Sequence, residues 1–140
     1  MMKCKIKEID RVYLACLIDS EGCICLAYGN KNKQILRPII NISNTDKFIL
    51  NWAYNIIRRG WISHTPKVLH HKVLYIYSIG SKRDAIYVLN IILPYLKIKK
   101  QQAQLLLEFC KNHEHGKYTN RDFEIFNKIK FLNKRGVDEY

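Results

Sequence analysis

The sequence predicts an α+β fold in which helices cover one face of a four-stranded antiparallel sheet. Segments with a helical spacing of apolar residues alternate with pairs of strand-like segments, in the order helix, two strands, helix, two strands and further helices. The strands of each pair follow one another closely enough for hairpins, which pair antiparallel. One face of such a sheet packs under helices, and the other is open to solvent or a ligand.

Length and composition indicate one globular domain, residues 1–140. Apolar residues make up 48% of the chain, which excludes a disordered protein. No apolar run reaches the roughly 18 residues of a membrane span, and the first residues lack the apolar core of a signal peptide. We therefore expect an intracellular protein with no membrane partner. Frequent Ile, Lys, Asn and Tyr residues, whose codons are rich in A and T, point to a mitochondrial, chloroplast, phage or bacterial setting.

The five cysteines predict no disulfide framework. Their number is odd and they are scattered, which fits a reducing compartment. Cys23-x-Cys25 and His113-x-His115 lack the usual two-to-four-residue spacing of a structural zinc site. Small buried or half-buried residues are the preferred interpretation.

Positive charge is concentrated in the middle of the chain. The net charge is +12, and residues 21–83 contain ten Lys or Arg against two acids. This distribution is typical of a surface that binds a polyanion, whereas charge that serves solubility alone would be spread evenly. A small basic interaction protein that binds no nucleic acid is a further alternative.

The first helix is predicted over residues 8–21. Acids at its start suit the positive end of the helix dipole. Gly22 is expected to end the helix in the left-handed backbone conformation. Two strands follow over about residues 23–43, and Pro38 indicates that the second begins at a sheet edge or a bulge. Strand alternation predicts an outward-facing set, which comprises Cys23, Cys25, Ala27, Arg37, Ile39, Asn41 and Ser43.

The second helix carries the clearest terminal signals. Asn44 or Thr45 is its predicted N-cap, Asp46 lies in its first turn, and Gly60 follows its end. Its apolar stripe comprises Ile49, Trp52, Ala53, Ile56 and Ile57.

A second strand pair is predicted over about residues 61–79. Ser81 with Asp84 resembles the capping box of a third helix, which Pro94 ends. Further helices are predicted over about residues 97–134.

The end of the first helix contains an electrostatic conflict. Residues 14–22 read Leu-Ala-Cys-Leu-Ile-Asp-Ser-Glu-Gly, so the last turn of an apolar helix carries Asp19 and Glu21. The C-terminus of a helix holds partial negative charge, which disfavours each acid by roughly 0.3–1 kcal/mol. Such violations concentrate at functional sites, and a divalent cation would relieve this one. A pair of solvated acids is the alternative.

The same stretch resembles the motif of the LAGLIDADG homing endonucleases, with Cys16 in place of the first Gly, Ser20 in place of the second Ala and Glu21 in place of the final Asp. The family's αββαββα order also resembles the one predicted over residues 5 to about 112. In the family, two motif helices pack together and place their terminal acids side by side, where they bind divalent metals. A single motif implies the homodimeric branch and a long, pseudo-palindromic DNA target.

The resemblance implies roles for three residues of an active site. Glu21 of each subunit would be the ligand for Mg²⁺ or another divalent cation such as Mn²⁺. Lys99, after Pro94, would offset the charge that develops at the scissile phosphate. Asn44 matches a polar position that orients water or a metal ligand, where family members often carry the longer Gln. Asp19 would have a structural role.

Tyr13, Cys16 and Ser20 form the predicted dimer seam, because they share one face of the motif helix. A role in the core of a single chain is the alternative for this stripe. Cys16 stands where the family commonly has Gly, and its larger thiol would widen the crossing of the two helices.

The outer sheet face and the turns supply the predicted DNA contacts. Arg37 and Asn41 are base-edge candidates, since Arg pairs with guanine and Asn with adenine, and Ser78 is a further candidate. Phosphate contacts position DNA without specifying its sequence. The phosphate candidates are Lys31, Lys33, Lys67 and Lys72. Any one of these lysines alone is more typical of a solvated surface charge.

The sequence therefore predicts a site-specific, magnesium-dependent endonuclease that acts on double-stranded DNA as a homodimer and is encoded in a mobile element such as an intron. The family implies two-metal hydrolysis across the minor groove with short 3′ overhangs. The alternative is a non-cleaving nucleic-acid binder of the same fold, either an RNA-splicing maturase or a DNA-binding regulator.

Overall fold

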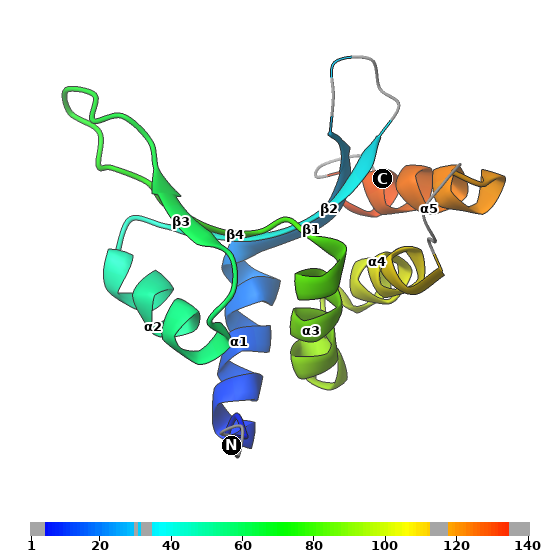
Figure 1. Ribbon diagram of the computed structural model, residues 1–140. Coiled ribbons are helices and arrows are strands. Elements are labelled where there is room, and N and C mark those ends of the chain that lie inside the picture. The colour runs from blue at the N-terminus through cyan, green and yellow to red at the C-terminus, as the bar shows by residue number, and fades with distance from the viewer. Residues whose placement is uncertain (1–4, 30, 32–34, 113–117, 135–140) are drawn as a thin grey trace, which may run out of the picture.

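The computed structural model describes residues 5–29, 31, 35–112 and 118–134. Within these residues, four strands form one antiparallel sheet in the order β1-β2-β4-β3 (Figure 1). The elements are α1 (Glu8–Glu21), β1 (Gly22–Tyr28), β2 (Leu36–Asn44), α2 (Lys47–Ile57), β3 (Trp61–His64), β4 (Tyr75–Ile79), α3 (Lys82–Ile92), the 3-10 helix η1 (Leu93–Tyr95), α4 (Lys100–Asn112) and α5 (Asn120–Leu132). This order confirms the predicted α+β fold.

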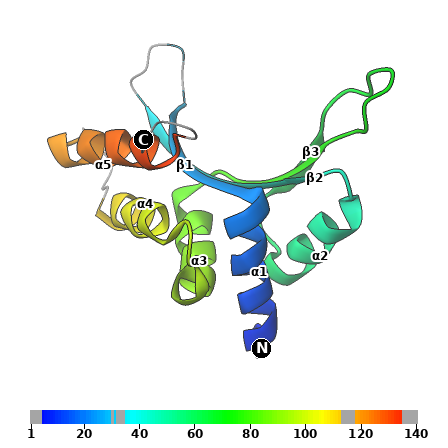
Figure 2. The same cartoon turned by 180° about the vertical axis from the view of Figure 1, so that it is seen from behind.

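The helices lie on one side of the sheet, and the other side is open (Figures 1 and 2). The sheet curves like a saddle, with β1 and β2 rising at one end and the β3–β4 connection at the other. Its inner face is buried against the helices by residues that alternate along the strands, as a two-residue period requires. They include Ile24, Leu26, Ile40, Ile42, Tyr77 and Ile79. The helix residues that meet them include Leu14, Ala15, Ile18, Leu50, Ala53 and Leu89.

Pro38 lies in a central strand, yet at a place where that strand is locally an edge. It pairs with Leu26 of β1, while the pairing of β2 with β4 begins only at Ile40. A proline lacks the N–H that a second neighbour would require, so it is tolerated at this point. The prediction that this strand begins at an edge agrees with the observed register.

Gly22 does not end α1 in the left-handed conformation that was predicted. Its φ of −103° and ψ of 174° are those of an extended strand residue. A side chain is excluded for another reason: an ideal Cβ at this position would lie 2.7 Å from the Ile18 carbonyl oxygen and 3.0 Å from that of Asn41. Glycine therefore lets the helix pass directly into the first strand.

Three predicted element boundaries are also wrong. The N-cap of α2 is Asp46, whose carboxylate accepts a hydrogen bond from the Phe48 N–H, and not Asn44 or Thr45. Strand β4 begins at Tyr75 and not at residue 72, because the Leu74 N–H donates to the Thr65 side-chain hydroxyl at 3.1 Å and not to a backbone carbonyl of the opposing segment.

The third boundary lies after Pro94, where the predicted helix start at residue 97 is also wrong. Helix α4 begins at Lys100, because the N–H groups of Lys97 and Lys99 donate to the side chain of Asp19. Segment 97–99 is therefore tied to α1.

Helix α5 is joined to the first hairpin by polar contacts. A capping box between Thr119 and Asp122 starts it, and Asn133 after its end donates to the Ile24 carbonyl at 2.9 Å. The Tyr118 hydroxyl accepts from the Leu36 N–H at 3.0 Å. These bonds hold the helix beside β1. Among the described residues, no helix is long and apolar enough to cross a membrane.

Candidate functional site

Glu21 is the last residue of α1, at the point where the helix meets the sheet. Its side chain is exposed, and the last turn of α1 contains no basic residue. The negative end of the helix dipole and the carboxylate therefore reinforce one another, as predicted from the sequence. This helix end therefore carries an exposed acid that no basic residue of α1 itself compensates.

Lys99 reaches the same helix end. Its Nζ donates to the backbone carbonyl of Asp19 at 2.7 Å, and its own N–H donates to Oδ1 of that residue at 2.9 Å. The Lys97 N–H donates to Asp19 Oδ2 at 2.8 Å. Both carboxylate oxygens of Asp19 are thus engaged in fixing segment 97–99. The Lys99 ammonium thus contacts Asp19, which lies two residues before Glu21 in the sequence. The catalytic role of Lys99 stays a prediction.

We expect Asp19→Asn to destabilise the fold and to misplace Lys99. The amide oxygen can still accept one N–H, but the amide NH₂ would face the second donor. Hydrogen bonds to charged groups contribute roughly 1.5–3 kcal/mol, and we expect a loss of about that size in the free energy of unfolding, measured by urea denaturation. Glu8→Gln, which removes an exposed acid from the first turn of α1, is the control and should cost at most about 1 kcal/mol. Equal effects of the two substitutions would contradict this role for Asp19.

Asn44 has a structural contact that was not predicted. It is the last residue of β2, and its Oδ1 accepts from the Asp46 N–H at 2.8 Å, which closes the turn into α2. The amide oxygen therefore uses one of its two acceptor sites for this turn. A role in orienting water or a metal ligand stays a prediction.

Strand register aligns polar residues across the outer face of the sheet. Asn41 lies between Cys23 of β1 and Ser78 of β4, and Ser78 lies beside Trp61 of β3. Cys25 shares this face, and its hydrogen bond with Cys23, together with burial, raises the pKa of its thiol. A neutral Cys25 thiol suits an apolar contact on this face.

Trp61 and Gly80 are site features that the sequence did not single out. Trp61 is 51% exposed, although tryptophan is usually well buried. An ideal Cβ on Gly80 would lie 3.0 Å from Trp61 Cη2 and 3.3 Å from Arg37 Nη2. The absence of a side chain at Gly80 thus lets the indole and the guanidinium approach one another on the outer face. Neighbouring residues of a strand point to opposite faces, and Ile62 is half-buried. This alternation could have predicted that Trp61 lies on the outer face.

Gly80→Ala should weaken base selection more than affinity. The added methyl would displace the Arg37 guanidinium, and one bidentate base contact is worth roughly 1–3 kcal/mol of discrimination. We expect this loss at one base pair of each half-site in competition binding between a preferred duplex and its single-base-pair variants. Arg37→Lys keeps the positive charge but removes the planar guanidinium, and it should cause the same loss of base discrimination. Unchanged preference in both variants would exclude Arg37 from base reading.

The basic residues of the turns lie at the raised ends of the saddle. A groove of about 550 Å³ at the β3–β4 connection is lined by Lys67 and Lys72, together with His70 and His71. Lys31 is exposed in the other hairpin, and Lys33 lies outside the described residues. Both hairpins thus carry positive charge toward the open side of the sheet.

The exposed side of α1 is unusually apolar. Tyr13 is 54% exposed and rests edge-on against Trp52 of α2, with ring centroids 4.9 Å apart. Cys16 and Ser20 are exposed on the same face, and the Ser20 hydroxyl donates back to the Cys16 carbonyl at 2.9 Å. The stripe is therefore not part of this chain's core. Ile9 and Val12 of α1 are further exposed apolar residues that were not predicted for this stripe, and Phe48 of α2 is also exposed.

The residues of one chain supply few ligands for a divalent cation. Mg²⁺ prefers carboxylate and other hard oxygens, and Glu21 presents one exposed carboxylate. The carboxylate of Asp19 is already engaged with two N–H groups. In the described part of the chain, no cluster of three or more His, Cys, Asp or Glu could hold a metal, and His113 and His115 lie outside it. Glu21 is therefore the candidate cation ligand of this helix end, and Mg²⁺ would need further oxygens from a second carboxylate, a phosphate or water.

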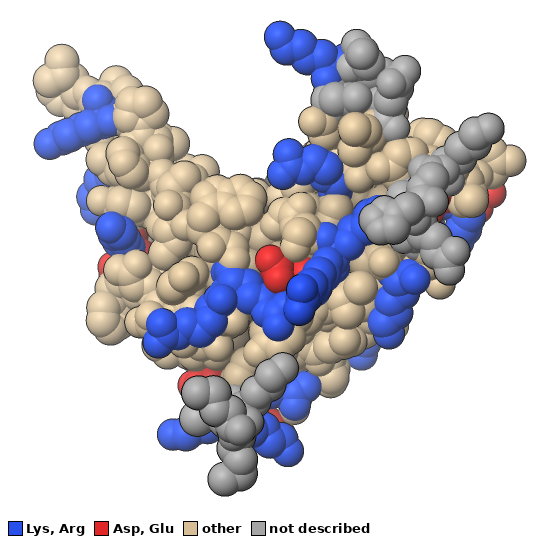
Figure 3. All heavy atoms as spheres, in the orientation of Figure 1, with Lys and Arg blue, Asp and Glu red and all other residues tan. Residues whose placement is uncertain are grey.

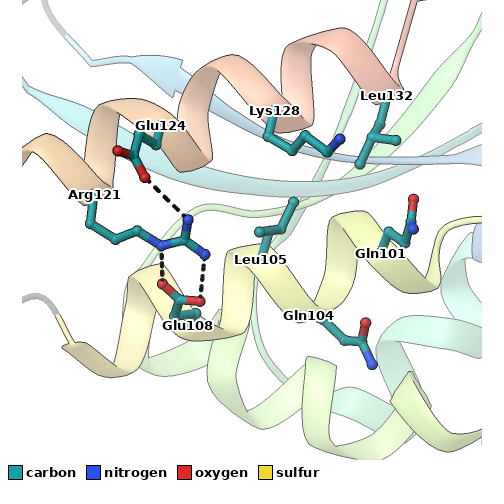
Figure 4. Close-up of a pocket in the computed structure, with 8 residues that line it drawn as sticks. All are labelled: Gln101, Gln104, Leu105, Glu108, Arg121, Glu124, Lys128 and Leu132. Carbon is teal, nitrogen blue, oxygen red and sulfur yellow. Dashed lines mark hydrogen bonds and ion pairs between the residues drawn. The ribbon is translucent and has the colours of Figure 1, made fainter.

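A groove of about 460 Å³ between α4 and α5 is separate from this site (Figure 4). At one end, Arg121 donates to Glu108 through Nε and Nη2 at 2.7 and 3.0 Å, and it also donates to Glu124 at 3.3 Å. The acids of this groove are thus paired with an arginine. We assign it a structural role in joining the two helices.

Comparison with known proteins gives a clear result for structure and none for sequence. No protein-family model matches the chain, and no curated protein is detectably similar in sequence. The homing endonuclease I-CvuI, in complex with its target in the presence of Ca, superposes with a TM-score of 0.77 at 21% identity, over 95% of this chain and 87% of that chain. The archaeal intron-encoded homing endonuclease I-Vdi141I, complexed with DNA, gives 0.72 at 18% identity, over 95% and 89%.

A third similar structure is about twice as long as this chain. The I-SmaMI LAGLIDADG homing endonuclease bound to cleaved DNA has a TM-score of 0.67 at 19% identity, over 92% of this chain but only 45% of that one. These superpositions agree with the order of helices and strands and with the open sheet described above. The chain therefore has the fold of the LAGLIDADG homing endonucleases.

Proposed function

We propose that this protein is a site-specific DNA endonuclease that acts as a homodimer with a divalent cation, Mg²⁺ or Mn²⁺. The observation that carries the proposal is the position of Glu21. It is an exposed acid at the negative end of a helix whose neighbouring face is apolar and exposed. A second copy packed on that face would cover the apolar stripe and bring two Glu21 carboxylates together.

We propose the following roles for the residues of this site. The outer sheet face would lie in the major groove, with Arg37, Asn41 and Ser78 facing the bases. Glu21 from each chain would hold the cation beneath the DNA backbone. A bound divalent cation lowers the pKa of water and neutralises phosphate charge. Lys99, held by Asp19, would offset the charge that develops at the reacting phosphate.

The similar structures support DNA as the substrate class. I-CvuI was solved with its target, and I-SmaMI was solved bound to cleaved DNA. The net charge of +12 on this chain agrees with a polyanionic partner. An origin in an intron or another mobile element is part of the same proposal.

The experiment begins with selection of a preferred duplex from a randomised library. The selected duplex is then incubated with the protein in Mg²⁺, with an EDTA control. We expect double-strand cleavage with short 3′ overhangs in Mg²⁺ alone. Tight, salt-sensitive binding without cleavage would instead support a non-cleaving binder, and structured RNA would then be tested for maturase activity. Absence of salt-dependent binding to any nucleic acid would exclude both functions.

A further inference from the structure

We infer that the DNA target extends beyond the sheet and contacts a second basic surface, the flank, formed by Arg58 and Arg59 at the end of α2 and by Lys82 and Arg83 at the start of α3. This inference rests on the proposed function, because it concerns the same duplex. It adds a contact surface on the helical side that the motif and the sheet do not supply.

The flank is a single structural unit although its halves are distant in sequence. Arg59 Nη1 lies 3.2 Å from Asp84 Oδ1, and its guanidinium lies 3.8 Å from the centroid of the Tyr87 ring. The Tyr77 hydroxyl donates to the Arg59 carbonyl, which joins this turn to the sheet. Arg59 is therefore the anchor of the flank and is unsuitable as a test position.

Two cations of the flank lie where local structure disfavours them. Lys82 and Arg83 occupy the first turn of α3, whose dipole is positive at that end and therefore repels cations. Burial lowers the pKa of Lys82. Arg58 has a φ of 59°, a left-handed conformation that glycine or asparagine usually adopts at a helix end. Asp84 pairs with Arg59, and the Lys82 ammonium lies 5.3 Å from the centroid of the Phe109 ring. The exposed charge of the flank therefore comes mainly from Arg58 and Arg83, which a polyanion would neutralise.

The two most exposed cations are accessible to a ligand. Arg58 uses Nε to cap the Asn55 carbonyl at 3.0 Å, and its side chain is otherwise exposed. Arg83 is exposed and makes no hydrogen bond or ion pair with any residue that the structure describes. Figure 3 shows Lys and Arg side chains in a row across this side of the molecule, beneath the sheet, with an acid among them.

The position of the flank indicates double-stranded DNA as its partner. A duplex lying between the raised ends of the saddle runs from the side of α1, which faces the viewer in Figure 2, to the side shown in Figure 1. If two chains meet through α1, each end of the duplex leaves the assembly over the end of α2 and the start of α3. The flank would then contact phosphates outside the base-reading footprint.

The test compares two lengths of the selected duplex. The short form contains only the base pairs that the two sheets cover. The long form adds about one helical turn, roughly 10 base pairs, at each end. We expect the wild-type protein to bind the long form more tightly, with a steeper salt dependence. The double variant Arg58→Gln/Arg83→Gln should bind both lengths equally, and the slope of log K against log salt should fall by about 0.9 for each phosphate that the variant no longer neutralises.

A matched control removes two exposed cations elsewhere. Lys5→Gln/Lys7→Gln lies at the foot of α1, remote from the sheet (Figure 1), and should keep the length dependence. Equal wild-type affinity for both lengths, or an intact length effect in the flank variant, would overturn the inference. Cleavage of the short duplex should be unchanged in the flank variant, so failure of the flank and failure of the endonuclease are distinguishable.

Discussion

Glu21→Gln is expected to abolish cleavage of the selected duplex while leaving affinity for it nearly unchanged. The substitution keeps the size of the side chain but removes the charge that holds a divalent cation. We expect the cleavage rate in Mg²⁺ to fall at least about 1,000-fold, which corresponds to roughly 4 kcal/mol of transition-state stabilisation. The Glu21 side chain is exposed and makes no hydrogen bond or ion pair within the described residues, so the fold should be unaffected.

Single-turnover cleavage and equilibrium binding, measured on the same duplex, separate the two effects. Lys99→Met provides a comparison at the same helix end, since it removes the ammonium and should also slow cleavage without weakening binding much. A Glu21→Gln protein that still cuts at a similar rate would show that the cation is held elsewhere.

Cys16→Arg is expected to prevent two chains from pairing and so to abolish cleavage. Cys16 is exposed in the single chain, so the longer side chain is accommodated there. In a dimer packed through α1, two guanidinium groups would face one another without partners, and an uncompensated buried charge costs roughly 3–5 kcal/mol. Sedimentation velocity with and without the duplex measures the effect.

Gln104→Arg, on the exposed side of α4, is the matched control for added charge. It should leave both assembly and cleavage intact. If Cys16→Arg assembles normally on DNA, the exposed stripe of α1 is not the contact between subunits.

The layout of the fold could be predicted because it depends on local periodicity. Alternation placed Ile40 and Ile42 on the inner face and Arg37 and Asn41 on the outer one, and the register agrees. The acid at the end of α1 was recognisable because it opposes the helix dipole. These signals lie within a few residues of one another in the sequence.

Features that depend on distant segments could not be predicted. The need for glycine at position 22 arises from a carbonyl of β2, and the start of α4 is set by N–H groups that bond to Asp19, about 80 positions earlier. The approach of Arg37 to Trp61 across Gly80 requires three strands in register. Neither spacing nor propensity carries information on such contacts.

Cleavage by this mechanism depends on two Glu21 carboxylates that meet at the centre of a dimer on DNA. A crystal structure of the protein bound to its selected duplex in Ca²⁺ tests this most directly, because Ca²⁺ takes the same oxygen ligands as Mg²⁺. We predict two chains joined through α1, with Glu21 of each about 2.3–2.6 Å from a bound Ca²⁺ beside a DNA phosphate. A single chain on the duplex, or two Glu21 side chains far apart with no ion between them, would contradict it.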